Sequence, residues 1–360
     1  MNCNIDAICA PPREDPEGMR WPSPGMLIVG RGHRMAWREV GAPDGEPWLL
    51  LHGGPGSGCQ PGQLAPLDLR RQRAIAPDQR GCGASRPRGG LRGNHTSALV
   101  EDLEALRRHL CLGRWRVLAG SWGTVLALAY ASRYPQCVEG LVLRGAFALS
   151  RREVGGLLQP DRQTVRVLGS ESFWPAKAGV PLPVVLRRLA QLLQSGTPGV
   201  AGLRVARRWS LLESARAERG MRRSARHAAL EGRTGLSTAI RRKWAALRRS
   251  QRRQLAQVLL RRIGRVDRRS LFKYRIQAHY LRHRGFVRPP DLDVAVNVLA
   301  AQGVPVQWVH GCFDAVCPPA NSRRWAARGG QLSLALGGHL GHEPDVLAAL
   351  RVAVREMACG

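Results

Sequence analysis

Short apolar runs alternate with amphipathic stretches in two separate parts of the chain, a pattern typical of strands joined by helices. In the first part we expect a β-hairpin at 26–40, strands at 47–51, 74–77, 115–119 and 138–144, and a helix at 96–110. In the last part we expect helices at 292–302, 320–328 and 344–359 and strands at 304–310 and 332–336. The sequence therefore predicts an α/β fold, with a mostly parallel sheet covered by helices on both faces.

The chain between these two parts has a different pattern, in which apolar residues recur at helical spacing without intervening strands. The stretches at 182–193 and 236–263 are the clearest helices, and the second carries arginines along its polar face. An α/β core interrupted by an inserted helical domain is the simplest organisation. We therefore predict a loose leader at 1–25, a first core part at 26–149, an arginine-rich helical cap at 150–288 and a second core part at 289–360.

Residues 115–128 contain the clearest candidate for chemistry, a serine at a tight turn between a strand and a helix. Ser121 lies within the segment AGSWG at 119–123, and the small residues at both ends fit a nucleophile elbow, where strand and helix approach closely. A serine at the start of a helix also has backbone N–H groups facing its oxygen. The alternative is a serine that only caps the helix.

Two strands of the last part end in groups able to activate this serine, which needs a base to take its proton and a carboxylate to orient that base. Asp314 and His339 follow two successive predicted strands. Parallel strands bring such ends to one edge of the sheet, here in the chain order serine, acid, histidine. His310 and His342 are competing bases, and Asp314 or His339 could instead have only a structural role in its loop.

A glycine-rich loop after the predicted strand at 47–51 meets a second requirement of acyl transfer, which is a pair of donors for the oxyanion. The sequence HGGPG at 52–56 lacks side chains that would obstruct its backbone N–H groups. We expect the N–H groups of Gly54 and Trp122 to form the oxyanion hole. The loop could instead serve only as a turn.

The composition excludes several classes of protein. Nine cysteines show neither the ligand spacing of a zinc site nor the pattern of a disulfide framework, so we expect no metal. No apolar run is long enough to cross a membrane, and no secretory signal is visible at the start of the chain, which favours a cytoplasmic location.

The charge of the chain is strongly positive, at +30. All but three of the 56 basic residues are arginines, and residues 214–270 hold 18 of the basic residues against three acidic ones. A nucleic-acid partner is nevertheless disfavoured, because aromatic residues make up only 5% of the chain and no nucleic-acid-binding motif is present. A solvated, arginine-rich surface of the cap is the simpler interpretation.

Six segments of the chain carry motifs that can be compared with known families. They are HGGPG at 52–56, DQRGCGAS at 78–85, GSWG at 120–123, YPQCVEGLVLRGAF at 134–147, HGCFDAVCP at 310–318 and GGHLGHEP at 337–344. Together they resemble the proline iminopeptidase (prolyl aminopeptidase) family of α/β-hydrolases, from about residue 32 to residue 344.

The resemblance implies an α/β-hydrolase fold and a serine peptidase that releases N-terminal proline from peptides, without a metal or organic cofactor. It also implies that Ser121, Asp314 and His339 are the catalytic residues. An esterase or amidase of the same fold, acting on a small ester or amide with a relaxed need for a free amino terminus, is the alternative. The same triad serves both reactions.

In the family that the chain resembles, cap glutamates bind the α-amino group of the substrate. One such motif provides Glu213 here, with Glu231 as a rival placement. In a second motif Gln277 stands where a carboxylate is expected. The predicted substrate-binding residues are therefore Gly53, Glu213 and Gln277. We expect weaker selection for a charged amino terminus, because an amide supplies no charge.

Overall fold

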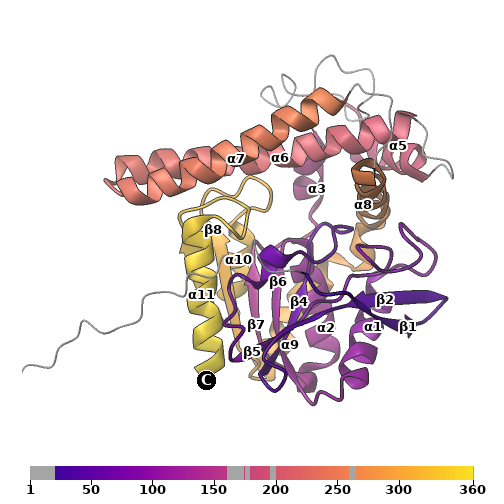
Figure 1. Ribbon diagram of the computed structural model, residues 1–360, viewed down its shortest axis with the longest axis vertical. Coiled ribbons are helices and arrows are strands. Elements are labelled where there is room, and N and C mark those ends of the chain that lie inside the picture. Colours follow the sequence, from indigo (N-terminus) through magenta and orange to yellow (C-terminus); the bar gives the residue numbers. More distant parts are fainter. Residues whose placement is uncertain (1–20, 160–173, 175–178, 195–199, 259–264, 360) are drawn as a thin grey trace, which may run out of the picture.

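The computed structural model describes residues 21–159, 174, 179–194, 200–258 and 265–359, and its central element is a seven-stranded sheet (Figure 1). The strands are β3 (Glu39–Gly41), β4 (Glu46–Leu51), β5 (Gln72–Ile75), β6 (Trp115–Gly120), β7 (Val138–Arg144), β8 (Val306–Gly311) and β9 (Gln331–Ala335). Their order is β3-β5-β4-β6-β7-β8-β9, and all pair in parallel except β3, which is antiparallel to β5. The predicted hairpin is present as β1 (Gly25–Val29) and β2 (His33–Trp37). The mostly parallel sheet expected from the sequence is confirmed.

The strands form because their apolar side chains are buried on both faces of the sheet. In β4, Leu49 and Leu51 pack in one apolar cluster, and Trp48 and Leu50 pack in another. The first cluster is completed by α1 (Thr96–His109), α2 (Trp122–Arg133), α9 (Pro289–Ala301) and α10 (Ala320–Ala326), and the second by α11 (Pro344–Cys359). Helices therefore cover both faces, which explains the continuous apolar runs of the strands.

A group of helices connects β7 to α9 and lies over the carboxyl ends of the strands, across the top of Figure 1. Those described are α3 (Arg151–Leu158), α5 (Leu182–Gln194), α6 (Val200–Leu230), α7 (Thr234–Val258) and α8 (Arg265–Arg282). The long helices α6 and α7 run side by side, with Met221 and Ala225 packed on Ile240. The boundaries predicted for this cap, at 150 and 288, stay a prediction.

Some details differ from the sequence prediction. The helix predicted at 236–263 is described only to Val258, and Leu255 in it is 45% exposed although its spacing indicated the buried face. Its neighbour Gln254 faces α6 instead, with its Oε1 atom 3.4 Å from Ser210 Oγ. The predicted leader, apart from residues 21–25, lies outside the described residues.

Two strands begin at other residues than predicted. β5 begins at Gln72 instead of 74 and ends before Pro77, and β8 begins at Val306 instead of 304, directly after Pro305. Pro77 lies two residues after the end of β5, and Pro305 lies directly before β8. Proline has no backbone N–H group and cannot donate a hydrogen bond to a neighbouring strand. In the described part of the chain, no helix has the length and apolar character needed to cross a membrane.

Candidate active site

Ser121 lies at a sharp turn between β6 and α2, at the carboxyl edge of the sheet. Its backbone has φ 56° and ψ −127°, a strained conformation for a residue with a side chain. The following helix comes so close to β4 that a Cβ at Gly123 would lie 2.5 Å from the carbonyl oxygen of Leu51. This close approach explains the small residue two positions after the serine, and the geometry is that of a nucleophile elbow.

Ser121, His339 and Asp314 form one hydrogen-bonded chain, although they are far apart in the sequence. His339 Nε2 lies 3.2 Å from Ser121 Oγ, and His339 Nδ1 lies 2.8 Å from Asp314 Oδ2. The histidine is on the loop after β9 and the aspartate on the loop after β8. In this arrangement Nδ1 donates to the carboxylate, which leaves Nε2 able to accept the serine proton.

Asp314 is held by its own loop. Its Oδ1 atom accepts hydrogen bonds from the backbone N–H groups of Val316 (2.7 Å) and Cys317 (2.9 Å). Burial alone would raise the pKa of Asp314. The charge of His339 and hydrogen bonds from His310 and His339 outweigh burial and hold the pKa of this carboxyl below its ordinary value. The carboxylate is therefore charged at every pH near neutral.

The two other histidines considered as bases are placed differently. Neither His310 nor His342 is among the described residues that line the cavity of Ser121. His310 is buried, with Nδ1 2.7 Å from Ser322 Oγ and Nε2 3.4 Å from Asp314 Oδ2. His342 has an exposed side chain. The geometry favours His339 as the base and gives His310 a supporting contact with the carboxylate.

A cavity of 330 Å³ opens at Ser121, between the edge of the sheet and the helices α6 and α8. The predicted site residues that line it are Gly53, Gly54, Ser121, Glu213, Gln277 and His339. Gly53 lies against the nucleophile, since a Cβ there would be 3.8 Å from Ser121 Oγ. Asp314 lies behind His339, and Trp122 is the first residue of α2. The roles of Gly54 and Trp122 in an oxyanion hole stay predictions.

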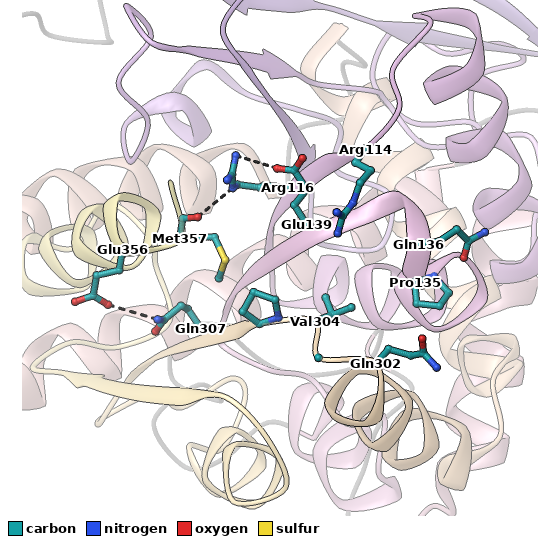
Figure 2. Close-up of a pocket in the computed structure, with 12 residues that line it drawn as sticks. Arg114, Arg116, Pro135, Gln136, Glu139, Gln302, Val304, Gln307, Glu356 and Met357 are labelled. Carbon is teal, nitrogen blue, oxygen red and sulfur yellow. Dashed lines mark hydrogen bonds and ion pairs between the residues drawn. The ribbon is translucent and has the colours of Figure 1, made fainter. Parts of the chain in front are cut away.

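A larger cavity of 730 Å³ lies at the opposite edge of the sheet, near the amino ends of β6, β7 and β8 (Figure 2). Polar groups in its wall contact each other: Arg116 is 3.0 Å from Glu139, and Gln307 donates to Glu356 over 3.4 Å. The described residues that line it include no serine, cysteine or histidine. Ligands of open α/β sheets bind at the carboxyl ends of the strands, so the smaller cavity is the candidate site.

Known proteins share this fold, and some are similar to this chain over most of its length. The chain matches the α/β-hydrolase fold family over residues 46–345. It is 31% identical to a proline iminopeptidase of Arabidopsis thaliana, over 93% of this chain and 80% of that relative. A proline iminopeptidase of Xylella fastidiosa is 30% identical, over 91% of this chain and 93% of the relative. The chain belongs to the proline iminopeptidase family of α/β-hydrolases. A thermophilic esterase from Thermogutta terrifontis has the same fold, with a TM-score of 0.56 at 19% identity over 94% of this chain and 98% of its own.

In this member of the proline iminopeptidase family, Glu213 belongs to a network that the sequence did not reveal. Its Oε2 atom accepts hydrogen bonds from Lys273 Nζ (2.6 Å) and the Tyr274 hydroxyl (3.0 Å), and its Oε1 atom accepts one from Gln277 Nε2 (2.7 Å). Burial alone would lower the pKa of Lys273, but the charge of Glu213 outweighs burial and raises that pKa, so the ammonium is charged. Lys273 therefore neutralises Glu213.

Of the two glutamates considered as substrate ligands, Glu213 is among the described residues that line the cavity and Glu231 is not. Glu231 directly follows α6, is exposed, and lies 3.2 Å from His227. The two glutamates are 18 positions apart along α6 and the residue that follows it, which corresponds to about 27 Å along the axis. Trp209, one turn before Glu213 on α6, stacks on Tyr274 at 5.0 Å between ring centroids and so holds α6 against α8.

Sequence reasoning also missed the cysteine of the site. Cys317 lines the cavity, and burial raises the pKa of its thiol well above the ordinary value, so it is no rival nucleophile. One feature of the sequence could have indicated Lys273: it is one of three lysines in a chain whose basic residues are otherwise arginines.

The loop that carries His339 is supported on two sides. On one side, fully buried Glu343 accepts hydrogen bonds from the backbone N–H groups of Gly338 (2.8 Å) and Leu340 (2.9 Å), the two neighbours of the histidine. On the other side, α6 comes so close that a Cβ at Gly220 would lie 2.8 Å from Gly338 Cα. The position of the imidazole therefore depends on a buried carboxyl group and on a cap helix.

Glu343 makes the stability of this loop depend on pH. Burial raises the pKa of Glu343 to about 7, although its two backbone hydrogen bonds favour the charged form. An unfolded glutamate has a pKa of about 4.3. The folded state therefore binds more protons between these values, and the contribution of Glu343 to stability is lost as the pH rises from about 4 to about 7.

Between pH 5 and pH 8, we expect the free energy of unfolding of the unsubstituted protein to fall by about 3 kcal/mol relative to that of Glu343→Gln. The reason is that a glutamine at this position cannot titrate. Urea unfolding at both pH values measures the difference. Glu356→Gln, at an exposed position, is the matched control and should show no such change. Equal pH dependence in the two variants would contradict the account of Glu343.

Proposed function

We propose that the protein is a serine peptidase that releases an N-terminal proline, or a similar residue, from peptides through an acyl-enzyme intermediate. The proposal depends above all on the hydrogen-bonded chain of Ser121, His339 and Asp314. Ser121 and His339 line a cavity that Glu213 also lines. The relatives described as proline iminopeptidases support the class of substrate.

The geometry supports two proton transfers through one imidazole. His339 Nε2 takes the proton of Ser121 Oγ as that oxygen attacks the substrate carbonyl carbon, and the N–H groups of Gly54 and Trp122 receive the oxyanion. His339 then gives the proton to the leaving nitrogen, the C–N bond breaks, and an ester on Ser121 remains. Water attacks this ester while His339 takes its proton, and the returned proton restores the serine.

The substrate's amino group would bind at the network around Glu213. Gln277 Oε1 is buried and has no hydrogen-bond partner among the described residues, so it can accept an N–H from the substrate. Both oxygens of Glu213 already accept hydrogen bonds, and Lys273 balances its charge. The network therefore orients an amine without strongly attracting a positive charge.

An esterase or amidase that does not require a free amino terminus is the second candidate. The specific observation that favours it is the ion pair between Lys273 and Glu213, which removes the net negative charge expected for an ammonium site. Proline p-nitroanilide, its N-acetyl form and a p-nitrophenyl ester distinguish the two functions. A drop in kcat/KM of at least about tenfold on acetylation supports the aminopeptidase. Equal values for the first two substrates would leave only the second candidate.

We expect Gln277→Glu to raise the preference for a free amino terminus about tenfold, because it adds the missing carboxylate beside Glu213. The measured quantity is the ratio of kcat/KM for proline p-nitroanilide to that for its N-acetyl form. Gln302→Glu adds the same charge at an exposed residue of the other cavity and should leave the ratio unchanged. An unchanged ratio in Gln277→Glu would remove this residue from amine binding.

The basic residues of α7 fit the surface interpretation, since those in its middle turns are exposed. Exposed basic residues there include Arg241, Arg242, Lys243, Arg248, Arg249 and Arg252. The cytoplasmic location and the absence of a nucleic-acid partner remain predictions from the sequence.

A further inference from the structure

Arg216 is a buried guanidinium in the wall of the active-site cavity. It lies on α6, one turn after Glu213 and one turn before Gly220, and the residue is 7% exposed. One of its terminal nitrogens donates to the Gln159 carbonyl oxygen over 2.7 Å, while its Nε atom is buried without a hydrogen-bond partner. A cation in this position needs an explanation, because arginine is rarely buried unless it is paired.

The described part of the chain places no carboxylate against Arg216. No acidic side chain among the described residues forms an ion pair with it, and Glu213, the acid one turn earlier, is bonded to other groups through both oxygens. Burial lowers the pKa of Arg216, and no negative charge among the described residues opposes that effect. A guanidinium nevertheless keeps its proton near neutral pH. The charge therefore stays in the wall, and leaving it uncompensated is costly.

The other charges of the cavity wall are already matched, which leaves Arg216 as the excess. Lys273 pairs with Glu213, and the charge of Asp314 opposes the lowering of the pKa of Arg144 by burial. The position of Arg216 is also informative, because the next turn of α6 touches the loop of the catalytic histidine at Gly338. The guanidinium thus lies between the amine network and the base, where the groups flanking a scissile carbonyl would be held.

We propose that Arg216 binds a carboxylate of the substrate, so that the enzyme selects substrates with a negative charge near the scissile carbonyl. A planar guanidinium fits a carboxylate with two parallel hydrogen bonds, which gives both affinity and orientation. The inference rests on the proposed function, because the same Ser121 must attack the bound substrate. Two parts of a substrate can supply the group: the C-terminal carboxylate of a dipeptide, or a carboxylate in the acyl chain.

Two matched substrate pairs distinguish these sources. The leaving-group pair is Pro-Ala and Pro-Ala amide, and the acyl pair is mono-p-nitrophenyl glutarate and p-nitrophenyl valerate. For the unsubstituted enzyme we expect kcat/KM to be at least about tenfold higher for the charged member of one pair. In Arg216→Met that ratio should fall close to one. Arg216→Lys should give an intermediate ratio, because it keeps the charge but loses the bidentate geometry.

Arg226→Met is the matched control, since it removes the same charge from an exposed residue of the same helix and should keep the ratio. Equal kcat/KM within both pairs for the unsubstituted enzyme would overturn the inference, as would a ratio that survives in Arg216→Met. If Arg216→Met does not fold, Arg216→Lys is the test. A kcat/KM ratio within the pair equal to that of the unsubstituted enzyme would then overturn bidentate binding. Hydrolysis of the esters without cleavage of either Pro-Ala or Pro-Ala amide would overturn the peptidase function alone, and the ester pair would still decide the role of Arg216.

Discussion

Ser121→Ala is expected to lower kcat for proline p-nitroanilide by about a million-fold, the size of loss that follows removal of a triad serine. The hydroxyl lies 3.2 Å from His339 Nε2, so its removal leaves the base without a nucleophile to activate. No ester intermediate can then form. The oxyanion donors proposed at Gly54 and Trp122 would remain, and they would set the small residual rate.

The matched control for this variant is Ser132→Ala, on the same helix. The Ser132 hydroxyl donates to the Ala129 carbonyl oxygen over 3.3 Å, in the third turn of α2. The control should keep full activity, and both variants should melt near the temperature of the unsubstituted protein. A fluorophosphonate probe should label the control but not Ser121→Ala, as measured by intact mass. Retention of about one per cent of kcat or more in Ser121→Ala would mean that another group is the nucleophile.

Asp314→Asn is expected to lower kcat by about ten-thousand-fold with little change in KM. An asparagine side chain cannot accept hydrogen bonds on both sides, from the Val316 and Cys317 backbone and from His339 Nδ1. Its oxygen accepts hydrogen bonds from the two backbone N–H groups, so its NH2 group faces His339 Nδ1 and drives the histidine toward the tautomer with its proton on Nε2. That tautomer cannot take the proton of Ser121.

Asp293→Asn provides the comparison for this second variant. The Asp293 carboxylate accepts a hydrogen bond from Trp325 Nε1 over 2.7 Å and lies 2.8 Å from Arg328, so it also loses charged contacts on substitution. It is not among the described residues lining the active-site cavity, and kcat should stay unchanged. Steady-state kinetics from pH 6 to pH 9 and a thermal melt of both variants test the claim. Equal losses of kcat would show that Asp314 acts only through stability.

The parts of the site that follow strands could be predicted from the sequence. Asp314 and His339 each come shortly after an apolar run, and parallel strands with helical crossovers must end at one edge of the sheet. The small residues around Ser121 likewise reflect a local constraint, the close approach of α2 to β4. Each of these features appears in the sequence as a short pattern of neighbouring residues.

The charge balance of the cavity could not be predicted, because it arises where α6 packs on α8. Glu213 and Lys273 are 60 residues apart in the sequence, yet their side chains are in contact. Helical periodicity identifies the apolar face of each helix but not the helix that it meets. For the same reason, the sequence does not distinguish Arg216 from the other arginines of its basic segment, and only the structure shows that it is buried.

The contact of Gly220 with Gly338 brings two backbones together with no side chain between them. The spacing between the helix that lines the substrate pocket and the loop that holds the imidazole is thus fixed by the thickness of the polypeptide itself. Any larger residue at either position must push the two apart. Substitutions that alter substrate preference by moving this helix therefore also change the distance between His339 Nε2 and Ser121 Oγ. We expect specificity and turnover to evolve together in this enzyme.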